Sequence, residues 1–366
     1  MSKHLKISII TPLYNGLPYV RQCLESIDAQ TMKDFEVIIV DDGSNDGSDE
    51  YVQQYAETHN NVTVLRQNRR YAGAARNKGM SHAQGDYILF LDADDYFEPD
   101  LLEGSLNRIM EADADICVFK ARSLDNRTGM IKPMEQTCRL ELCPDEPTFN
   151  RVTNPRNIFC FTTTAPWSKL YRKSFLETHG LRYQDTRSAN DIYFVYLALA
   201  LADRITVLDK ELLVYRQHNK ESLQGSQQKD PLAFYEALLA TRQALIDRGI
   251  YAELSHAFTN NALEFCTYNL RTMKSDPVAH ELVFNHLKTV AFEYLEIVGK
   301  PREFFYARAA KDFDEGQLII SKSYRQYRKA LSMQESPLIR KAIRKAKSMK
   351  CRLLSAGREK RKQRRQ

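Results

Sequence analysis

ILFLDADD, residues 88–95, joins four apolar residues directly to a group of three carboxylates. A continuous apolar run is typical of a strand that is buried on both faces of a sheet. Like charges this close repel one another, so we expect the carboxylates to emerge where solvent or a ligand can reach them. The stretch therefore predicts a core strand whose carboxyl end lies at an open edge of the sheet.

Three earlier apolar runs alternate with helical patterns. The runs are KISIITPLYN (6–15), FEVIIVDDGS (35–44) and NVTVLRQ (61–67), and helical periodicity occupies 19–30, 48–59 and 73–83. This alternation predicts an α/β fold with a mostly parallel sheet flanked by helices on both faces. Polar clusters at 12–15, 41–46 and 92–95 each follow a strand, so we expect them to meet at the carboxyl edge, where such sheets bind ligands.

The rest of the chain divides at about residue 225. PDLLEGSLNRIMEA (99–112) and NDIYFVYLALALAD (190–203) read as helices, and ADICVFKAR (114–122) and ITVLDKELLVYRQH (205–218) as strands. Residues 123–160 are rich in proline and predict an irregular excursion over the site, and 166–180 read as a turn into a helix. Helical periodicity then dominates, which predicts an α/β domain at 1–225, a smaller all-α domain at 226–335 and a tail at 336–366.

The composition is that of a globular protein, with 43% hydrophobic and 27% charged residues among 366. The seven cysteines are odd in number and lack a CxxC or Cys/His metal spacing, which favours reduced thiols in a cytosolic protein. Cys138 and Cys143 resemble half of a zinc site, but no second half follows. The N-terminus reads as a strand rather than a signal peptide, and the longest apolar stretch, 193–202, is too short to span a bilayer.

The formal net charge of +6 is concentrated at the C-terminus. From Leu338 onward there are 13 Lys/Arg and one acidic residue, Glu359, while the remaining chain holds 40 basic and 46 acidic residues. Apolar residues spaced three or four apart in 338–366 predict a basic amphipathic helix on an anionic membrane surface. A disordered solubilising tail is the alternative, and a nucleic-acid partner is disfavoured because aromatic residues are absent from the segment.

The acidic residues after the fourth strand allow three interpretations: a solvated strand end, a helix cap, or a divalent cation site. Asp92 and Asp94 lie two residues apart, so in an extended chain they share one side and can converge on one ion. Hard oxygen ligands suit Mg²⁺ or Mn²⁺, which usually complete their coordination with phosphates and water. Asp95 is interpreted as a cap for the following helix.

The order of the motifs resembles the inverting family 2 glycosyltransferases, which have the GT-A fold, across roughly residues 5–222. The matching segments are TPLYN (11–15), VDDGSNDGS (40–48), GAARNKG (73–79), FLDADD (90–95), WSKLYRKSF (167–175), NDIYF (190–194) and YRQHNKES (215–222). The resemblance implies a nucleotide-sugar-binding catalytic domain of the bacterial surface-polysaccharide type.

Residue by residue, the resemblance implies a donor-binding set. Its members are Pro12, Tyr14 and Asn15 around the nucleoside, Asp42 or its neighbour Asp41 on the base or ribose, and Arg76 and Asn77 near the nucleotide. A helix start that carries glycine and arginine suits anions, because N–H groups and a guanidinium both attract them. The alternatives are a core aromatic for Tyr14 and a plain turn for Asp41 and Asp42.

The resemblance also assigns metal ligands and a base. Asp94 would be the direct ligand of Mn²⁺ or Mg²⁺, Asp92 would lie closer to the ribose, and His218 would be a third ligand unless it is simply a surface or core histidine. Asp191 would deprotonate the acceptor hydroxyl, with Asn190 where the family more usually has a glutamate. The alternative for Asp191 is a helix cap.

Trp167 and Lys169 complete the implied site. Trp167 would lie near the donor sugar or the acceptor, and Lys169 close to the phosphates; a core anchor is the alternative for Trp167. The resulting hypothesis is a metal-dependent transfer of one sugar, from a UDP-sugar, to a glycan or lipid-linked acceptor at the inner face of the cell membrane. The alternatives are a nucleotidyltransferase and a non-catalytic, membrane-associated binder of sugar nucleotide or glycan.

Overall fold

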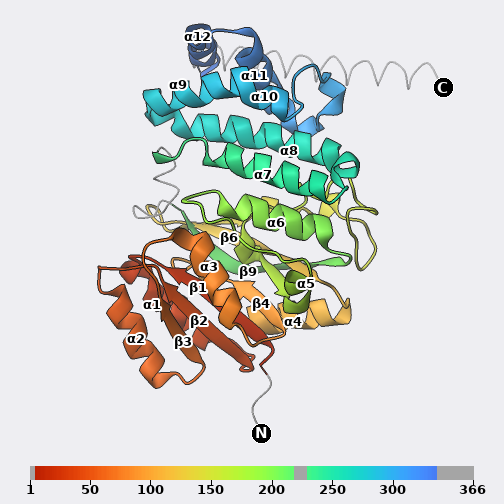
Figure 1. Cartoon of the computed structure of the whole chain (residues 1–366). Helices are drawn as coiled ribbons and strands as arrows, with labels where there is room; N and C mark the ends of the chain where they lie inside the picture. The colour runs from red at the N-terminus through yellow and green to blue at the C-terminus, as the bar shows by residue number, and fades with distance from the viewer. Residues whose placement is uncertain (1–4, 218–228, 336–366) are drawn as a thin grey trace, which may run out of the picture.

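The computed structural model describes residues 5–217 and 229–335. Within them, nine strands form one mixed sheet in the order β3-β2-β1-β4-β8-β6-β9-β5, with β7 paired to β6 (Figure 1). The strands are β1 (Ile7–Leu13), β2 (Phe35–Asp41), β3 (Val62–Arg66), β4 (Tyr87–Phe90), β5 (Tyr96–Phe97), β6 (Ile116–Asp125), β7 (Met130–Met134), β8 (Lys169–Arg172) and β9 (Ile205–Gln217).

The first half of the sheet is parallel and fully covered. Strands β3, β2, β1 and β4 run in the same direction. Every residue of β2 is buried, as a strand between two helical layers requires. Successive side chains of β1 enter opposite layers: Ile9 belongs to one hydrophobic cluster and Ile10 to the other. The predicted α/β fold is confirmed.

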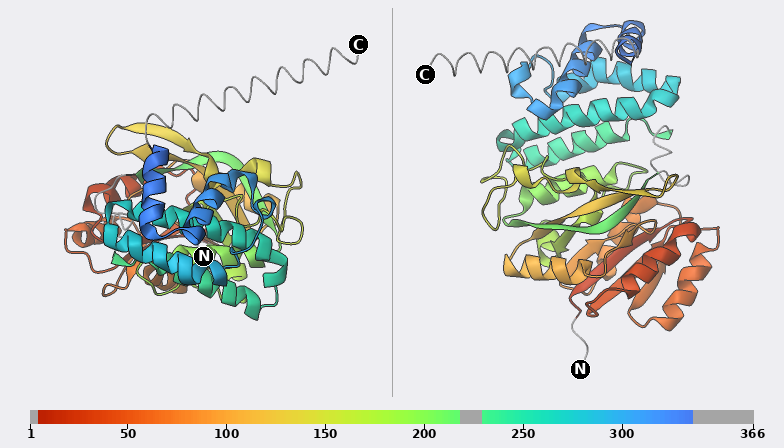
Figure 2. Two further views of the ribbon diagram at one scale, coloured as in Figure 1. Left: turned by 90° about the horizontal axis from the view of Figure 1, so that it is seen from above. Right: turned by 180° about the vertical axis from the view of Figure 1, so that it is seen from behind.

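The helices of the first 201 residues lie on the two faces of this sheet (Figures 1 and 2). They are α1 (Leu17–Asp28), α2 (Ser48–Thr58), α3 (Tyr71–His82), α4 (Leu101–Glu111), α5 (Lys173–Thr178) and α6 (Asn190–Leu201). Residues of α1, α2 and α4 join one hydrophobic cluster, and residues of α3, α5 and α6 join the other. Helix α1 is typical: its buried residues Val20, Cys23, Leu24 and Ile27 recur every three or four positions.

The C-terminal region stacks helices in further layers on α6 (Figure 1). These are α7 (Ala233–Asp247), α8 (Tyr251–Thr272), α9 (Pro277–His286), α10 (Phe292–Tyr294), α11 (Ala310–Ser321) and α12 (Tyr324–Glu335). One hydrophobic cluster continues without interruption from Phe194 and Tyr196 of α6 into Phe234 and Leu238 of α7 and Phe258 of α8. The helical region therefore shares its core with one face of the sheet, and the expected boundary near 225 stays a prediction.

The segment 166–180 differs from the expectation of a turn leading into a helix. Residues 169–172 form strand β8, which pairs antiparallel with β4 and with β6, before the short helix α5 begins. Four residues are too few for their pattern to distinguish a buried strand from a helix. Because β8 lies between β4 and β6, it joins the parallel half of the sheet to the remaining strands.

Two further expectations concern the membrane and the tail. Along the described part of the chain, no helix combines the length and apolar composition needed to cross a bilayer.

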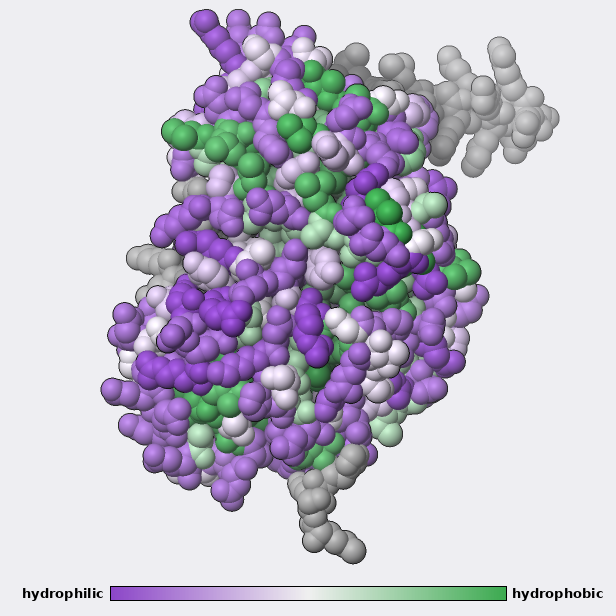
Figure 3. Space-filling model, in the orientation of Figure 1, coloured by the Kyte–Doolittle hydropathy of each residue, from purple (hydrophilic) through white to green (hydrophobic). Residues whose placement is uncertain are grey.

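On the face drawn in Figure 3, hydrophilic residues cover most of the surface and hydrophobic ones occur in small groups. The predicted amphipathic helix at 338–366 and the proposed ligand His218 lie outside the described residues.

Candidate active site

A cleft of about 1280 Å³ opens at the carboxyl ends of the parallel strands and extends to the helical region. The polar segments that follow β1, β2 and β4 meet there, as their positions after the strands predict. The sequence-predicted residues that line it are Pro12, Tyr14, Asn15, Asp42, Arg76, Asp92, Asp94, Trp167 and Asp191. Asp41, Asn77 and Lys169 do not line it.

Aromatic and cationic side chains line the cleft beside β1. The Tyr14 ring is 43% exposed, and the Arg69 guanidinium lies 3.0 Å from its centroid. The Asn15 side-chain oxygen accepts a hydrogen bond from the backbone N–H of Asn45. An exposed ring with a cation over it excludes the core-aromatic interpretation of Tyr14 and offers a flat surface beside positive charge.

Asp42 and its neighbour Asp41 have separate surroundings. Asp42 accepts hydrogen bonds from the backbone N–H groups of Arg70 and Tyr71, so its carboxylate holds the start of α3. Asp41 accepts from the backbone N–H of Ser44 and forms an ion pair with Arg66. Of the two candidates only Asp42 lines the cleft, because successive residues of a strand point to opposite sides.

The GAARNKG motif packs α3 against β1 and against the segment that holds Tyr183 and Gln184. A Cβ on Gly79 would lie 2.4 Å from Ile10 Cγ2, and one on Gly73 would lie 2.4 Å from the Gln184 carbonyl oxygen. The Asn77 amide exchanges two hydrogen bonds with the backbone N–H and carbonyl of Tyr183. The motif thus holds the chain before α6 close to α3. Asn77 acts in that contact and does not line the cleft, so its expected place near the nucleotide stays a prediction.

Arg76 of α3 connects Asp92, which follows β4, with Asn190 at the start of α6. Its Nη2 donates to Asp92 Oδ1 at 2.6 Å, and its Nη1 donates to Asn190 Oδ1 at 3.3 Å. Asp92 and Asp191 both raise the pKa of Arg76, which lies buried between them. The guanidinium therefore supplies the positive charge that relieves the repulsion expected at the end of β4.

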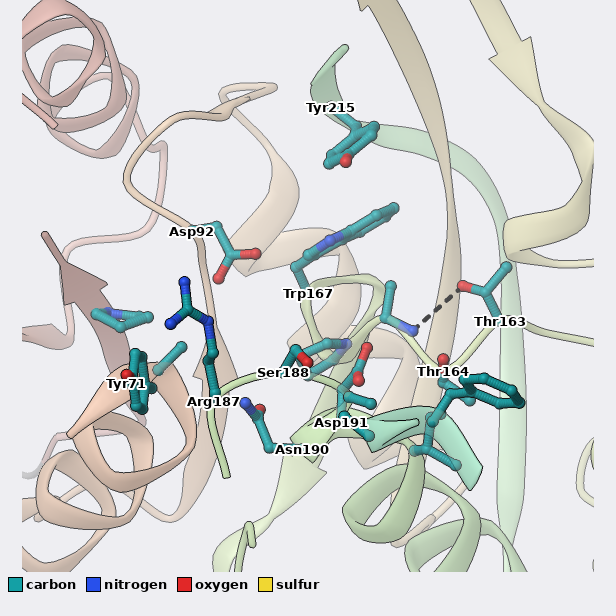
Figure 4. A pocket seen from close by; sticks show the side chains of 18 of the residues that line it. Tyr71, Asp92, Thr163, Thr164, Trp167, Arg187, Ser188, Asn190, Asp191 and Tyr215 are labelled. Atoms are coloured by element: carbon teal, nitrogen blue, oxygen red, sulfur yellow. Dashed lines mark hydrogen bonds between the residues drawn. The ribbon is translucent and has the colours of Figure 1, made fainter. Parts of the chain in front are cut away.

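Asp191 occupies the first turn of α6 and faces the cleft (Figure 4). Burial raises the pKa of its carboxyl group, while the nearby Arg76 guanidinium and the backbone N–H groups at the helix start oppose that rise. Ala189, two residues before Asp191, has a φ of 58°, a left-handed conformation that is unfavourable for alanine. A partly buried carboxylate with a raised pKa is suited to accept a proton.

Strained backbone gathers around this cleft. Asn15, Tyr71 and Ala189 have φ angles of 49°, 66° and 58°, and all three line it. Such conformations persist only where the surrounding structure enforces them, and they concentrate at functional sites. The cleft is therefore shaped by the fold as a whole rather than by side-chain choice alone.

Trp167 lies at the centre of the lining and is 5% exposed. Its ring stacks on Tyr215, with centroids 5.5 Å apart and an interplanar angle of 18°. Figure 4 shows Asp92, Trp167 and Asp191 around the same space. Trp167 is thus packed in the core and also lines the cleft. The core-anchor interpretation and the expected place beside the ligand are therefore compatible.

Lys169 lies beneath the cleft wall and does not line the cleft, so its expected place near the phosphates stays a prediction. Its side chain has no exposed surface, and its Nζ donates to the carbonyls of Thr163 and Ala165 and to the Ser168 hydroxyl. Burial lowers its pKa from 10.5 to about 7. The residue points inward because β8 is a central strand, which the sequence pattern did not predict.

The carboxylates that follow β4 are not equivalent. Asp92 and Asp94 line the cleft. Asp95 has no exposed surface, accepts a hydrogen bond from the Arg216 backbone N–H, and leaves Oδ2 without a partner. Burial raises the pKa of Asp95 well above its ordinary value. It therefore does not cap α4, whose N-terminal cap position is Asp100.

The donor chemistry of Asp92 and Asp94 fits a divalent cation. Two carboxylates suffice for Mg²⁺ or Mn²⁺ when phosphates and water supply the other ligands. Across 5–217 and 229–335, no cluster of three or more His, Cys, Asp or Glu side chains is arranged to hold a metal. The cysteines at 138 and 143 are unbridged and join no such cluster, so the half zinc site has no support there.

Several cleft residues were not predicted from the sequence. Arg69 and Tyr71 directly precede the GAARNKG motif, and Tyr215 opens the quoted YRQHNKES segment, so both places carried a signal. Arg187 likewise lies three residues before the NDIYF motif. The residues of α8 had no signal, because they reach the cleft through the packing of a helix that lies far from the motifs in sequence.

Comparisons with known proteins place the chain among glycosyltransferases. A family model described as glycosyl transferase family 2 matches residues 8–180. The putative glycosyltransferase EpsH of Bacillus subtilis is 34% identical over 245 residues, which cover 65% of this chain and 69% of EpsH. Glycosyltransferase GlyA of Streptococcus pneumoniae is 30% identical over 213 residues, but the chain spans only 30% of its length.

A longer match is to a Staphylococcus aureus protein. The poly(ribitol-phosphate) beta-N-acetylglucosaminyltransferase TarS is 26% identical over 335 residues, covering 88% of this chain and 56% of TarS. The crystal structure of TarS residues 1–349 in complex with UDP-GlcNAc superposes with a TM-score of 0.66 at 24% identity, covering 88% of this chain and 92% of that one. The superposition includes the C-terminal helices as well as the sheet, and it supports the same fold.

Proposed function

The chain belongs to family 2 of the glycosyltransferases, and we propose that it transfers a single sugar from a UDP-sugar to a hydroxyl of a glycan or lipid-linked acceptor. The proposal includes an inverting reaction within cell-surface polysaccharide synthesis. The choice of UDP is supported by TarS, whose structure holds UDP-GlcNAc. The observation that carries the proposal is the grouping of Asp92, Arg76, Asn190 and Asp191 at one cleft.

In this mechanism Asp191 accepts the proton of the acceptor hydroxyl. As the acceptor oxygen bonds to the anomeric carbon, the bond from that carbon to the diphosphate breaks on the opposite face, which inverts the configuration. The raised pKa of Asp191 brings the carboxylate closer to the pKa range in which a base works near neutral pH. Arg76 holds Asp92 and Asn190 in place and keeps positive charge beside the departing diphosphate.

Asp92 and Asp94 are the residues that would hold Mn²⁺ or Mg²⁺. When bound, such an ion stabilises the negative charge that develops on the diphosphate. The exposed Tyr14 ring, with Arg69 over it, is the proposed surface for the nucleobase, and Asp42 shapes the adjacent start of α3. Trp167 and Tyr215 would border the transferred sugar.

We propose that the basic segment 338–366 brings the enzyme to an anionic membrane surface on the cytoplasmic side, where a lipid-linked acceptor would be found. The support is its 13 Lys/Arg and its apolar spacing. Binding of the full chain to vesicles with and without anionic lipid, and of the chain ending at residue 335, would measure this contribution separately from catalysis.

The experiment for catalysis measures UDP release from UDP-GlcNAc, UDP-glucose and UDP-galactose, with and without Mn²⁺, together with UDP binding by calorimetry. We expect Asp191→Asn to lower turnover at least 100-fold while UDP binding persists. Asp314→Asn, at an exposed position of α11, is the matched control and should be as active as the unmodified chain. Full turnover by Asp191→Asn, or no binding of UDP by the intact chain, would contradict the proposal.

A further inference from the structure

The cleft has a second half whose wall is one face of helix α8. Asn261, Glu264, Phe265, Tyr268 and Asn269 of α8 line it, as does Arg271 near the end of the helix. Their spacing of three and four places them on one side of the helix. The helical region therefore contributes directly to the cavity that contains Asp191, although no sequence motif falls within it.

Aromatic residues line both this wall and the part of the cleft that contains Asp191. Tyr268 is 53% exposed although it lines the cleft, and Tyr215 lines the cleft as well. Tyr215 in turn stacks on Trp167. One turn before Tyr268, Phe265 meets Tyr196 of α6 edge to face. Exposed aromatic rings in a concave site are suited to the apolar faces of sugar rings.

The charges of this half compensate one another within the described residues. Six charged residues line it, three of each sign: Arg139, Lys229, Asp230, Glu264, Arg271 and Asp312. Arg271 donates to Asp312 and, at 2.8 Å, to Glu315. Glu264 pairs with Arg308 at 2.9 Å. Recognition of a polyanion requires an excess of cations whose charge is available to the ligand. Here Arg271 already serves two carboxylates, Arg139 donates to the Cys160 carbonyl, and the lining cations do not outnumber the lining carboxylates.

Uncharged polar groups remain for ligand hydroxyls. Asn261 and Asn269 are 6% and 7% exposed, and the side-chain amide of each donates one hydrogen bond to a carbonyl of its own helix. Within 5–217 and 229–335, a second N–H and an oxygen of each amide are therefore not used by these bonds. Thr163 and Thr164 also line the cleft. A wall of aromatic rings, amides and hydroxyls with balanced charge matches a neutral carbohydrate.

We propose that the α8 face formed by Asn261, Phe265, Tyr268 and Asn269 is the acceptor subsite, and that its ligand is an uncharged glycan rather than a polyol-phosphate polymer. The inference rests on the proposed function, because an acceptor subsite requires a transferase. The inference goes beyond the proposed function because it assigns the helical region a role in the choice of acceptor. It also separates this chain from TarS, which is named for poly(ribitol-phosphate).

The test uses the full chain and the Tyr268→Ala variant, with Tyr294→Ala on α10 as the control. Tyr294 is 62% exposed and does not line the cleft. The acceptors are neutral oligosaccharides of glucose, galactose and N-acetylglucosamine, and a ribitol-phosphate hexamer. We expect Tyr268→Ala to raise the KM for a neutral acceptor roughly tenfold while the KM for the UDP-sugar stays within twofold. Tyr294→Ala should change neither.

Three results would overturn the inference. One is preferred transfer to the ribitol-phosphate hexamer. The second is an unchanged acceptor KM in Tyr268→Ala. The third is a binding result, for use if turnover is too slow for KM values to be compared. It is the absence of any saturation-transfer NMR signal from the neutral oligosaccharides on the UDP-loaded chain. Failure of the proposed function has a different signature, because the intact chain would then neither bind UDP nor release it from a UDP-sugar.

Discussion

Lys169→Met is the most informative single change, because it removes a cation that lies buried without a carboxylate in its hydrogen-bonding shell. Lys169 Nζ lies 2.9 Å from the Thr163 carbonyl, 2.8 Å from the Ala165 carbonyl and 3.1 Å from the Ser168 hydroxyl. A neutral amine satisfies the same three partners, since it can donate to both carbonyls and accept from the hydroxyl. The geometry therefore tolerates both protonation states.

The magnitude follows from the two pKa values of Lys169. Burial lowers the pKa from 10.5 to about 7, although the thiol of Cys138 and the carboxylate of Asp191 act in the opposite direction. Between these two pH values the unfolded chain holds one proton more at this lysine than the folded chain. The free energy of unfolding should therefore rise with pH across that window, by up to ~1.4 kcal/mol per pH unit. Below about pH 7 both states are protonated and this dependence disappears.

The assay is urea denaturation of the unmodified chain and Lys169→Met at several values between pH 7 and 9.5. Other titrating groups cancel in the difference between the two chains, so the difference should change with pH in the direction and size given above. Lys132→Met, at an exposed position of β7, is the control and should run parallel to the unmodified chain. Parallel profiles for Lys169→Met would refute the assignment of a buried lysine that loses its charge near neutral pH.

Three further predictions concern the same cleft. Arg76→Met removes the partner of Asp92 and should lower the free energy of unfolding by about 3 kcal/mol in urea titrations; unchanged stability would contradict the pairing. Gly73→Ala brings a Cβ to 2.4 Å from the Gln184 carbonyl, so calorimetry should show a loss of about 1–3 kcal/mol, and an unchanged melting temperature would exclude that close approach. Burial raises the pKa of Asp191 above its ordinary value of 3.8. In a pH profile of kcat/KM, activity should therefore be lost as the pH falls through this raised pKa, at a pH above 3.8.

The first half of the fold was predictable because local signals and tertiary environment agree there. Strands β1 to β4 are continuous apolar runs, and helices with a regular buried face separate them. Strand β8 was not predictable, since Lys169–Arg172 is short and begins with a lysine, a residue rarely buried in a central strand. Its pairing with β4 and β6 outweighs its local pattern.

The site was predictable at the level of segments and less so at the level of side chains. Each quoted motif that the structure describes contributes at least one cleft residue, or packs the elements that do. Asp41, Asn77 and Lys169 do not line the cleft for one reason: a motif identifies a stretch of chain, whereas the side of the strand or helix decides which neighbour faces the cleft. The wall from α8 had no signal, because its residues meet the cleft only through helix packing.

The hydrogen-bond partners of Arg76 explain why an asparagine rather than a glutamate suits position 190. One guanidinium has a limited number of N–H groups: Nη2 serves Asp92 and Nη1 serves the Asn190 oxygen. A carboxylate at position 190 would compete with Asp92 for the same cation and place a second negative charge beside Asp191, which disfavours ionisation of both. With a neutral amide there, Arg76 remains paired with Asp92, and Asp191 remains the acidic member of the 190–191 pair. The loss of the second carboxylate therefore need not weaken the base, since Arg76 and the start of α6 already oppose the pKa rise that burial causes.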